Sequence, residues 1–182
     1  PTWYIRTSAL KDRLVDLNEN INWYPNYIKH GRFGNWLENN IDWALGRERY
    51  WGTPLPVWEC ETCHHQVCVG SVEELSDYAD RDLSDLDLHR PYVDQVHFEC
   101  PECAGRMTRV VELIDVWFDS GVSHAAVLET RKGLSSPAAL YLEGSDQHRG
   151  WFQSSLLTSV ATRHKAPYEA VLTHGFVVDG KG

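Results

Sequence analysis

Residues 141–151 read Tyr141-Leu-Glu-Gly-Ser-Asp-Gln-His-Arg-Gly-Trp151, and this stretch decides the fold that we expect. The apolar run 138–142 leads into a glycine-bracketed polar turn, which leads into a helical pattern over 151–163. A second apolar run, 170–173, follows the helix. Strand, helix and strand at this spacing predict a parallel crossover unit, whose strands are apolar because both faces are covered. The sequence thus predicts an α/β fold.

The polar turn between strand and helix is the first candidate site. It holds Glu143, Asp146, Gln147 and His148. In open parallel sheets, ligands bind beyond the carboxyl ends of the strands, where loop polar groups and a helix N-terminus converge. A simpler interpretation is that Asp146 only caps the helix and His148 is a surface residue. The concentration of polar groups favours a ligand site.

Two helices and a proline-rich strand are expected in the first third of the chain. Leucines at helical spacing predict a helix over about 8–19, and Trp36 begins a similar pattern over 33–45. Pro54 and Pro56 lack a backbone N–H and keep the preceding residue extended, so 50–58 reads as an exposed or edge strand.

Further along, a short helix and another apolar segment are expected. Ser71 is followed three residues later by Glu74, a capping-box pattern that predicts a helix over 71–80. The apolar run 110–118 is expected to be a strand, and Asp115-Val-Trp-Phe-Asp-Ser-Gly121 to be the transition from that strand to a loop. Trp117 in this segment suits a core as well as a pocket wall.

The cysteines form two pairs with metal-ligand spacing, Cys60-Glu-Thr-Cys63 and Cys100-Pro-Glu-Cys103. Two such pairs can surround one tetrahedral zinc, each contributing thiolates from a tight turn. We therefore expect a structural zinc site with a closed shell of four thiolates.

Other readings of the cysteines are weaker. Disulfides are the alternative, but thiols in the cytosol stay reduced. A redox pair would sit at the strand-to-helix junction of a thioredoxin-like unit, which the pattern lacks. Cys68 is expected to be a small buried apolar residue. His64 and His65 could replace a ligand, although four thiolates already complete the shell.

Composition bounds the function classes. The chain has 182 residues, 42% hydrophobic content and a formal net charge of −9, as expected for a folded globular protein. This charge disfavours a free-standing nucleic-acid binder, because affinity for phosphates comes mainly from clustered Lys and Arg. No apolar run approaches the roughly 18 residues of a membrane span, and no signal peptide is apparent. We expect the cytosol, and expect the chain to be an internal segment.

Together these stretches resemble the bacterial isoleucyl-tRNA synthetases. The resemblance spans nearly the whole chain and rests on the segments 42–56, 115–121, 141–151 and 172–182, in this order and spacing. It implies the second half of a class I Rossmann-like catalytic domain with a four-cysteine zinc insertion. It further implies activation of isoleucine with ATP and Mg²⁺ and transfer to tRNA(Ile), by a monomer without membrane association.

The resemblance also implies roles for individual residues. Glu143 looks like the residue that binds the aminoacyl-adenylate, with Gly144, Asp146 and Gln147 around its ribose and aminoacyl portion and His148 close by. Candidates for the apolar pocket of the isoleucine side chain are Trp117 and Trp151. On the adenine side, the expected residues are His174, Gly175 and Val178.

The motifs that the family needs for ATP are not in this sequence. Its His-x-Gly-His signature would precede the chain, its Lys-Met-Ser-Lys-Ser loop would follow Gly182, and the pocket sequence of its editing domain is not found. Both ATP motifs stabilise phosphates by positioning and electrostatics. We therefore expect residues 1–182 alone to be inactive. Editing matters in such enzymes because one methylene distinguishes substrates by only about 1 to 3 kcal/mol.

The resemblance divides the chain into three segments. Residues 1–50 are expected to be a helical connecting region, opened by a strand over 1–6, residues 51–112 the zinc-binding module, and residues 113–182 the catalytic half-domain. The alternatives are a valyl- or leucyl-tRNA synthetase of the same architecture, a zinc-ribbon module that only binds protein or RNA, and a small zinc hydrolase. The hydrolase would need an open zinc position.

Overall fold

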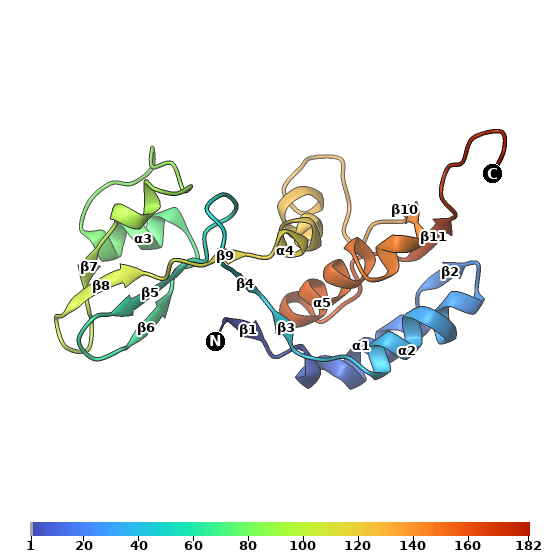
Figure 1. Cartoon of the computed structure of the whole chain (residues 1–182), viewed down its shortest axis with the longest axis horizontal. Helices are drawn as coiled ribbons and strands as arrows, with labels where there is room; N and C mark the ends of the chain where they lie inside the picture. Colours follow the sequence, from blue (N-terminus) through green and yellow to red (C-terminus); the bar gives the residue numbers. More distant parts are fainter. Residues whose placement is uncertain (1) are drawn as a thin grey trace. The chain divides into compact units, whose positions relative to one another are not determined.

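A computed structural model of the chain describes residues 2–182 (Figure 1). The chain forms two compact units, one comprising Thr2 and Leu45–Val116 and the other Trp3–Ala44 and Trp117–Gly182. We call them the cysteine unit and the sheet unit. Their bounds differ from the three segments expected from the sequence, whose assignment as domains stays a prediction. Pro1, the first residue of the strand expected over 1–6, lies outside the described residues.

The sheet unit is built on a parallel sheet in the order β10–β11–β2. Its strands are β2 (Asn22–Tyr24), β10 (Tyr141–Gly144) and β11 (Ala170–His174), and β11 pairs in parallel with both neighbours. Helix α5 (Trp151–Arg163) connects β10 to β11, so the crossover unit expected from the sequence is confirmed. The α/β fold class is confirmed as well. The third strand, β2, was not predicted.

Helix α5 carries much of the core of the sheet unit. Phe152, Leu156 and Val160 are fully buried along one face and belong to one cluster with Trp23 of β2 and Val171 of β11. These spacings of four bring the three side chains to the same side of the helix, where they meet the sheet. Removal of this apolar surface from water is the main stabilisation of the unit.

The N-terminal segment covers the same core. A 3₁₀ turn, η1 (Thr7–Leu10), continues into α1 (Lys11–Glu19), which confirms the first expected helix. A π-type segment, η2 (Lys29–Phe33), is kinked at Gly31 and leads into α2 (Gly34–Glu38). Two short strands, β1 (Tyr4–Ile5) and β3 (Trp43–Ala44), pair antiparallel.

The helix expected over 33–45 ends early, at Glu38. Asn40 donates its side-chain amide to the carbonyl of Thr7, and the Thr7 hydroxyl donates to the carbonyl of Ile41. These contacts hold the backbone extended for β3, so tertiary contacts override the helical pattern. The expected apolar strand over 110–118 was also wrong in its second half. Only β9 (Leu113–Ile114) is a strand, and Trp117 lies in helix α4 (Val116–Gly121).

The packing of α4 explains that difference. A side chain on Gly121 would meet the backbone of Ser154 in α5 at 3.0 Å, so the two helices touch at this glycine. Helix α4 is followed by η4 (His124–Leu128), whose His124 is buried with its Nε2 3.2 Å from the Thr158 hydroxyl. Burial is the main cause that lowers the pKa of His124.

The cysteine unit contains an antiparallel sheet in the order β6–β5–β8–β7. Its strands are β5 (Val57–Cys60), β6 (Gln66–Cys68), β7 (Phe98–Glu99) and β8 (Arg106–Arg109). Because β5 lies between β6 and β8, the expected edge strand was wrong beyond Pro56. The prolines precede the inner strand, and only Pro54 makes a bridge, to Leu113. A second short pair joins β4 (Gly46–Arg47) to β9.

Helix α3 (Val72–Ala79) and the turn η3 (Val93–Gln95) cover this sheet. The expected helix and its Ser71 cap are confirmed, since the Ser71 hydroxyl accepts from the backbone N–H of Glu74 at 3.1 Å. The Glu74 carboxylate accepts from the N–H of Gly70, one residue before the position that a capping box predicts. Arg109 is buried and forms an ion pair with Asp94, which also accepts from Arg90 at 2.8 Å. Partial burial of Asp94 opposes its charge, yet these two arginines keep its pKa below the usual value.

The buried face of α5 gives a first prediction. Leu156 is 0% exposed, so Leu156→Ala should lower the free energy of unfolding by about 2–5 kcal/mol through lost burial and a residual cavity. Leu134 is 49% exposed, and Leu134→Ala should change it by less than about 0.5 kcal/mol. Urea unfolding followed by circular dichroism measures both, and equal losses would contradict the assigned core.

Candidate functional site

The four paired cysteines meet at one end of the sheet of the cysteine unit. Each pair occupies a tight turn with the same hydrogen bonds: Cys60 N–H donates to His65 O at 2.9 Å, and Cys100 N–H donates to Gly105 O at 2.7 Å. The residue after each pair, His64 or Ala104, adopts a left-handed backbone with φ of 59° or 57°. Two equivalent turns thus face each other.

The sulfur positions fit one tetrahedral metal ion. All four ligand atoms lie within 4.8 Å of one another, and three Sγ–Sγ distances are 3.5, 3.7 and 3.4 Å. Zn–S bonds of about 2.3 Å place the sulfurs of a tetrahedral site about 3.8 Å apart. The same distances are far longer than the S–S bond of about 2.05 Å in a disulfide. All five cysteines are free thiols, so the disulfide alternative fails.

The electrostatics of the cluster favour a cation. The backbone N–H of Cys63 contributes most to lowering the pKa of Cys60 to about 6, against its desolvation. The N–H of His65 also favours a thiolate at Cys63, but hydrogen bonds with neighbouring thiols raise the pKa of Cys63 to about 12. Cys60 therefore ionises more readily than Cys63, because thiols that keep their protons can donate hydrogen bonds to its thiolate. A bound divalent cation would stabilise all four groups as thiolates.

Among the described residues, no histidine near the cluster takes the place of a cysteine as a metal ligand. The Nδ1 of His64 lies 3.1 Å from the Glu59 carboxylate, and the metal-ligand group contains no histidine among the described residues. Cys68 ends β6 and is exposed, so the prediction that it is buried was wrong. Successive side chains of β6 point to opposite faces of the sheet, so Val67 packs on the core and its neighbour Cys68 does not.

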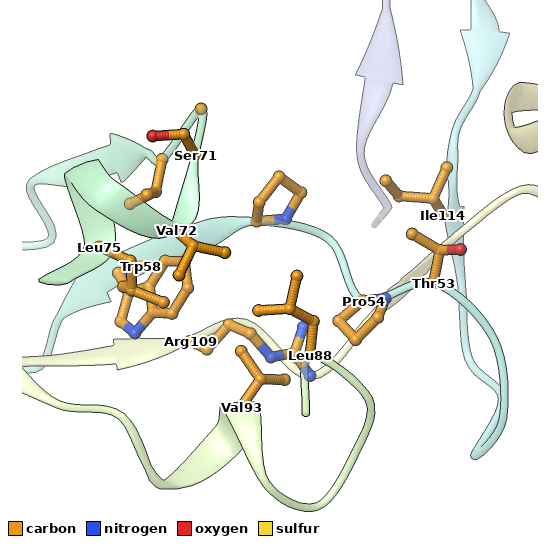
Figure 2. Close-up of a pocket in the computed structure, with 13 residues that line it drawn as sticks. Thr53, Pro54, Trp58, Ser71, Val72, Leu75, Leu88, Val93, Arg109 and Ile114 are labelled. Atoms are coloured by element: carbon orange, nitrogen blue, oxygen red, sulfur yellow. The ribbon is translucent and has the colours of Figure 1, made fainter. Parts of the chain in front are cut away.

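A cavity of about 290 Å³ lies in the cysteine unit, away from the metal-ligand group (Figure 2). Trp58, Val72 and Leu75 form one side, and Pro54 and Ile114 lie on another. The buried guanidinium of Arg109, already paired with Asp94, borders it. The lining is apolar and offers no unpaired charged group to orient a substrate.

The polar turn predicted as a ligand site follows β10 in the sheet unit. Glu143 is the exposed third residue of β10, and the turn η5 (Ser145–His148) follows directly. Gly144 leaves room for Asp146, whose Oδ1 would lie 2.8 Å from an added Cβ. Gln147 caps α5 by accepting from Trp151 N–H at 3.0 Å. The turn lies at the carboxyl end of a parallel strand, as ligand sites in such sheets do.

His148 faces inward. It is 1% exposed, its Nε2 lies 3.0 Å from the Thr173 hydroxyl, and its ring meets Trp23 edge-on with centroids 6.0 Å apart. Burial is the main cause that lowers the pKa of His148, and the nearby charge of Arg32 adds to it. His148 is therefore a buried group that links the turn η5 to β11, and its proximity to an adenylate stays a prediction.

The two tryptophans proposed as pocket walls lie close to one another around Gly150. An added Cβ on Gly150 would be 2.9 Å from the Trp117 ring, so only glycine lets Trp117 approach the start of α5. Trp151 stacks on Tyr141 with centroids 3.9 Å apart. Its indole N–H lies 3.1 Å from both the carbonyl of Ser120 and the hydroxyl of Ser123. Sequence analysis missed Ser123, and no local pattern signals it.

The expected adenine-side residues begin beside Gly144. His174 is the last residue of β11 and is in register with Gly144 of β10. Its Nδ1 lies 2.6 Å from the carbonyl of Gly175. Val178 follows in an exposed segment without regular secondary structure. The structure thus brings His174 to the polar turn, whereas Val178 makes no described contact with it.

Comparison with known proteins defines the class. The whole chain, residues 1–182, matches the family model of class I tRNA synthetases (I, L, M and V). The chain belongs to this class I tRNA synthetase family.

The similar proteins narrow the comparison. The chain is similar to the isoleucine–tRNA ligases of Bacillus thuringiensis (strain Al Hakam), Streptomyces avermitilis and Dehalococcoides mccartyi (strain ATCC BAA-2266), with 47%, 46% and 45% identity. Each alignment covers 100% of this chain but only 18–19% of the relative. The chain therefore spans about a fifth of the length of these curated relatives.

A solved structure supports the fold. The ternary complex of Agrobacterium radiobacter K84 agnB2 LeuRS with tRNA and LeuAMS aligns with a TM-score of 0.54. The alignment has 20% identity and covers 78% of this chain and 20% of that chain. Among the described residues, no helix is long and apolar enough to cross a membrane.

The cysteine cluster gives a second prediction. Protein purified without added zinc should contain about one zinc per chain, with four thiols protected until a chelator is added. Cys100→Ser should abolish zinc retention, because Cys100 is a buried member of the group. Cys68→Ser is the matched control and should leave the zinc content unchanged. Mass spectrometry of the metal and a thiol titration measure both, and five freely reactive thiols in the wild type would contradict the site.

Proposed function

We propose that this chain is part of an isoleucyl-tRNA synthetase, which activates isoleucine with ATP and Mg²⁺ and transfers it to tRNA(Ile). The observation that carries the proposal is the identity of 45–47% with isoleucine–tRNA ligases over the full chain. The polar turn after β10 supports it, since it has the location and the hydrogen-bonding groups that an adenylate needs.

The roles of the site residues form part of the proposal. Glu143 is exposed at the carboxyl end of β10, where its carboxylate is available to an aminoacyl-adenylate. The close approach of Asp146 to Gly144 supports binding of the ribose beside the strand end. Gln147 would contact the adenylate directly and would also position the site by capping α5. On the adenine side, we propose His174, Gly175 and Val178.

We propose that the cysteine cluster holds zinc with a structural role. Four thiolates close a tetrahedral shell and leave no position for a water or substrate. Such a shell argues against a zinc hydrolase, and the polar turn argues against a module that only binds protein or RNA. The zinc-binding module would comprise residues 51–112, between a helical connecting region (1–50) and the catalytic half-domain (113–182). The enzyme would be a cytosolic monomer.

A valyl- or leucyl-tRNA synthetase is the second candidate. The family model covers all of these specificities, and the LeuRS structure shares the fold. The names of the relatives with 45–47% identity favour isoleucine.

Amino-acid-dependent exchange of pyrophosphate into ATP tests the function. The full-length enzyme should show exchange with isoleucine at a far higher kcat/KM than with leucine, and a smaller excess over valine, because one methylene is worth about 1 to 3 kcal/mol. Glu143→Gln should lower kcat/KM by at least about tenfold, because it removes a charged hydrogen-bond acceptor. Exchange that is fastest with valine or leucine would overturn the assignment to isoleucine.

The fixed orientation of Trp151 gives a prediction about selectivity. Ser123→Ala removes one acceptor of the indole N–H but leaves the carbonyl of Ser120, so Trp151 should become looser without loss of the fold. KM for isoleucine should rise by about threefold to tenfold, with little change in kcat and in KM for ATP. Ser135→Ala, in the exposed loop after η4, is the control. An unchanged KM would show that Ser123 does not position the pocket.

A further inference from the structure

Two arginines share one aromatic ring in the sheet unit. The guanidinium carbon of Arg32 lies 4.8 Å from the centroid of Trp36, and that of Arg149 lies 4.1 Å from the same centroid. Both distances are within the range of favourable cation–π contacts. The ring therefore fixes two cationic groups, and a bound partner would not have to order them.

The two arginines come from segments that follow the two outer strands of the parallel sheet, β2 and β10. Arg32 belongs to η2, the segment after β2, and Arg149 follows η5, the turn after β10. Carboxyl ends of parallel strands share one edge of the sheet, which explains why residues so distant in sequence meet. Arg32 also contributes to the lowered pKa of His148, whose turn carries the proposed adenylate residues.

Neither guanidinium is neutralised by the protein. No carboxylate of the described residues forms an ion pair with Arg32 or Arg149, whereas Arg90, Arg109 and Arg163 each have one. This is notable in a chain with 26 acidic and 17 basic residues. Both side chains are exposed. Two like charges on one ring repel each other, and an anion between or beside them would remove this cost.

We propose that Arg32 and Arg149, held on Trp36, bind a phosphate group of a nucleotide substrate, either ATP or the single-stranded 3′ end of tRNA. Guanidinium groups bind phosphate oxygens through paired N–H donors, and arginine with an aromatic side chain is a common platform for single-stranded nucleic acid. The site supplies a local positive patch in an otherwise acidic chain. This inference rests on the proposed function, because it assigns the phosphate to a substrate of that reaction.

Kinetics of the full-length enzyme separate the two sources of phosphate. Pyrophosphate exchange needs ATP and isoleucine but no tRNA, whereas aminoacylation needs all three. Arg149→Gln and Arg32→Gln should each raise KM for one nucleotide by at least about tenfold, since each removes a charged hydrogen-bond donor. A raised KM for tRNA with unchanged exchange identifies tRNA as the source. A raised KM for ATP in exchange identifies ATP.

Two further variants control the test. Arg149→Lys keeps the positive charge but loses the paired donors, so its KM should lie between those of wild type and Arg149→Gln. Arg131→Gln removes an exposed arginine elsewhere in the sheet unit and should leave both KM values unchanged. If one glutamine variant misfolds and loses kcat in exchange, the KM values of the other glutamine variant still test the phosphate site.

Two negative results have different meanings. Normal exchange with both KM values unchanged in the glutamine variants would overturn the phosphate site and leave the proposed function intact. A wild-type enzyme without isoleucine-dependent exchange would overturn the proposed function and this inference with it.

Discussion

Parallel hydrogen bonding between β10 and β11 holds together the residues on which the proposed chemistry depends. It aligns Gly144 with His174, so the polar turn and the segment after β11 begin at the same edge of the sheet. The pairing needs a crossover, which α5 provides by burying Phe152, Leu156 and Val160 against the strands. This burial is needed to hold the two strands side by side, because parallel strands cannot be joined by a hairpin.

The beginning of α5 joins the packing of the sheet unit to the pocket that we propose for the substrate. Gly150 lets Trp117 approach, and Gln147 caps the helix, so the turn and the two tryptophans form one cooperative arrangement. The stack of Tyr141 on Trp151 uses a buried core residue to support a residue proposed for the pocket. Changes to the core behind this site should therefore affect substrate selectivity as well as stability.

The cysteine unit obtains its stability in a different way. Its sheet is small, and the buried ion pair of Arg109 with Asp94 connects β8 to η3. The four sulfurs lie at distances that a single zinc ion would accept without rearrangement, so the proposed zinc would couple metal binding to folding of the two turns. The cavity beside Arg109 is not lined by any of the four cysteines, and its lining is apolar.

Local sequence patterns determined much of this protein: the helix over 151–163, the helix cap at Ser71, the parallel crossover and the turns of the two cysteine pairs. Each depends on neighbours close in sequence, through helical periodicity, a cap or a tight turn. The early end of α2, the helical state of Trp117 and the third strand β2 were decided by contacts between distant residues. Tertiary structure alone brought Ser123 to Trp151 and Arg32 to Arg149, because side chains from separate segments meet only once the sheet and its helices have packed.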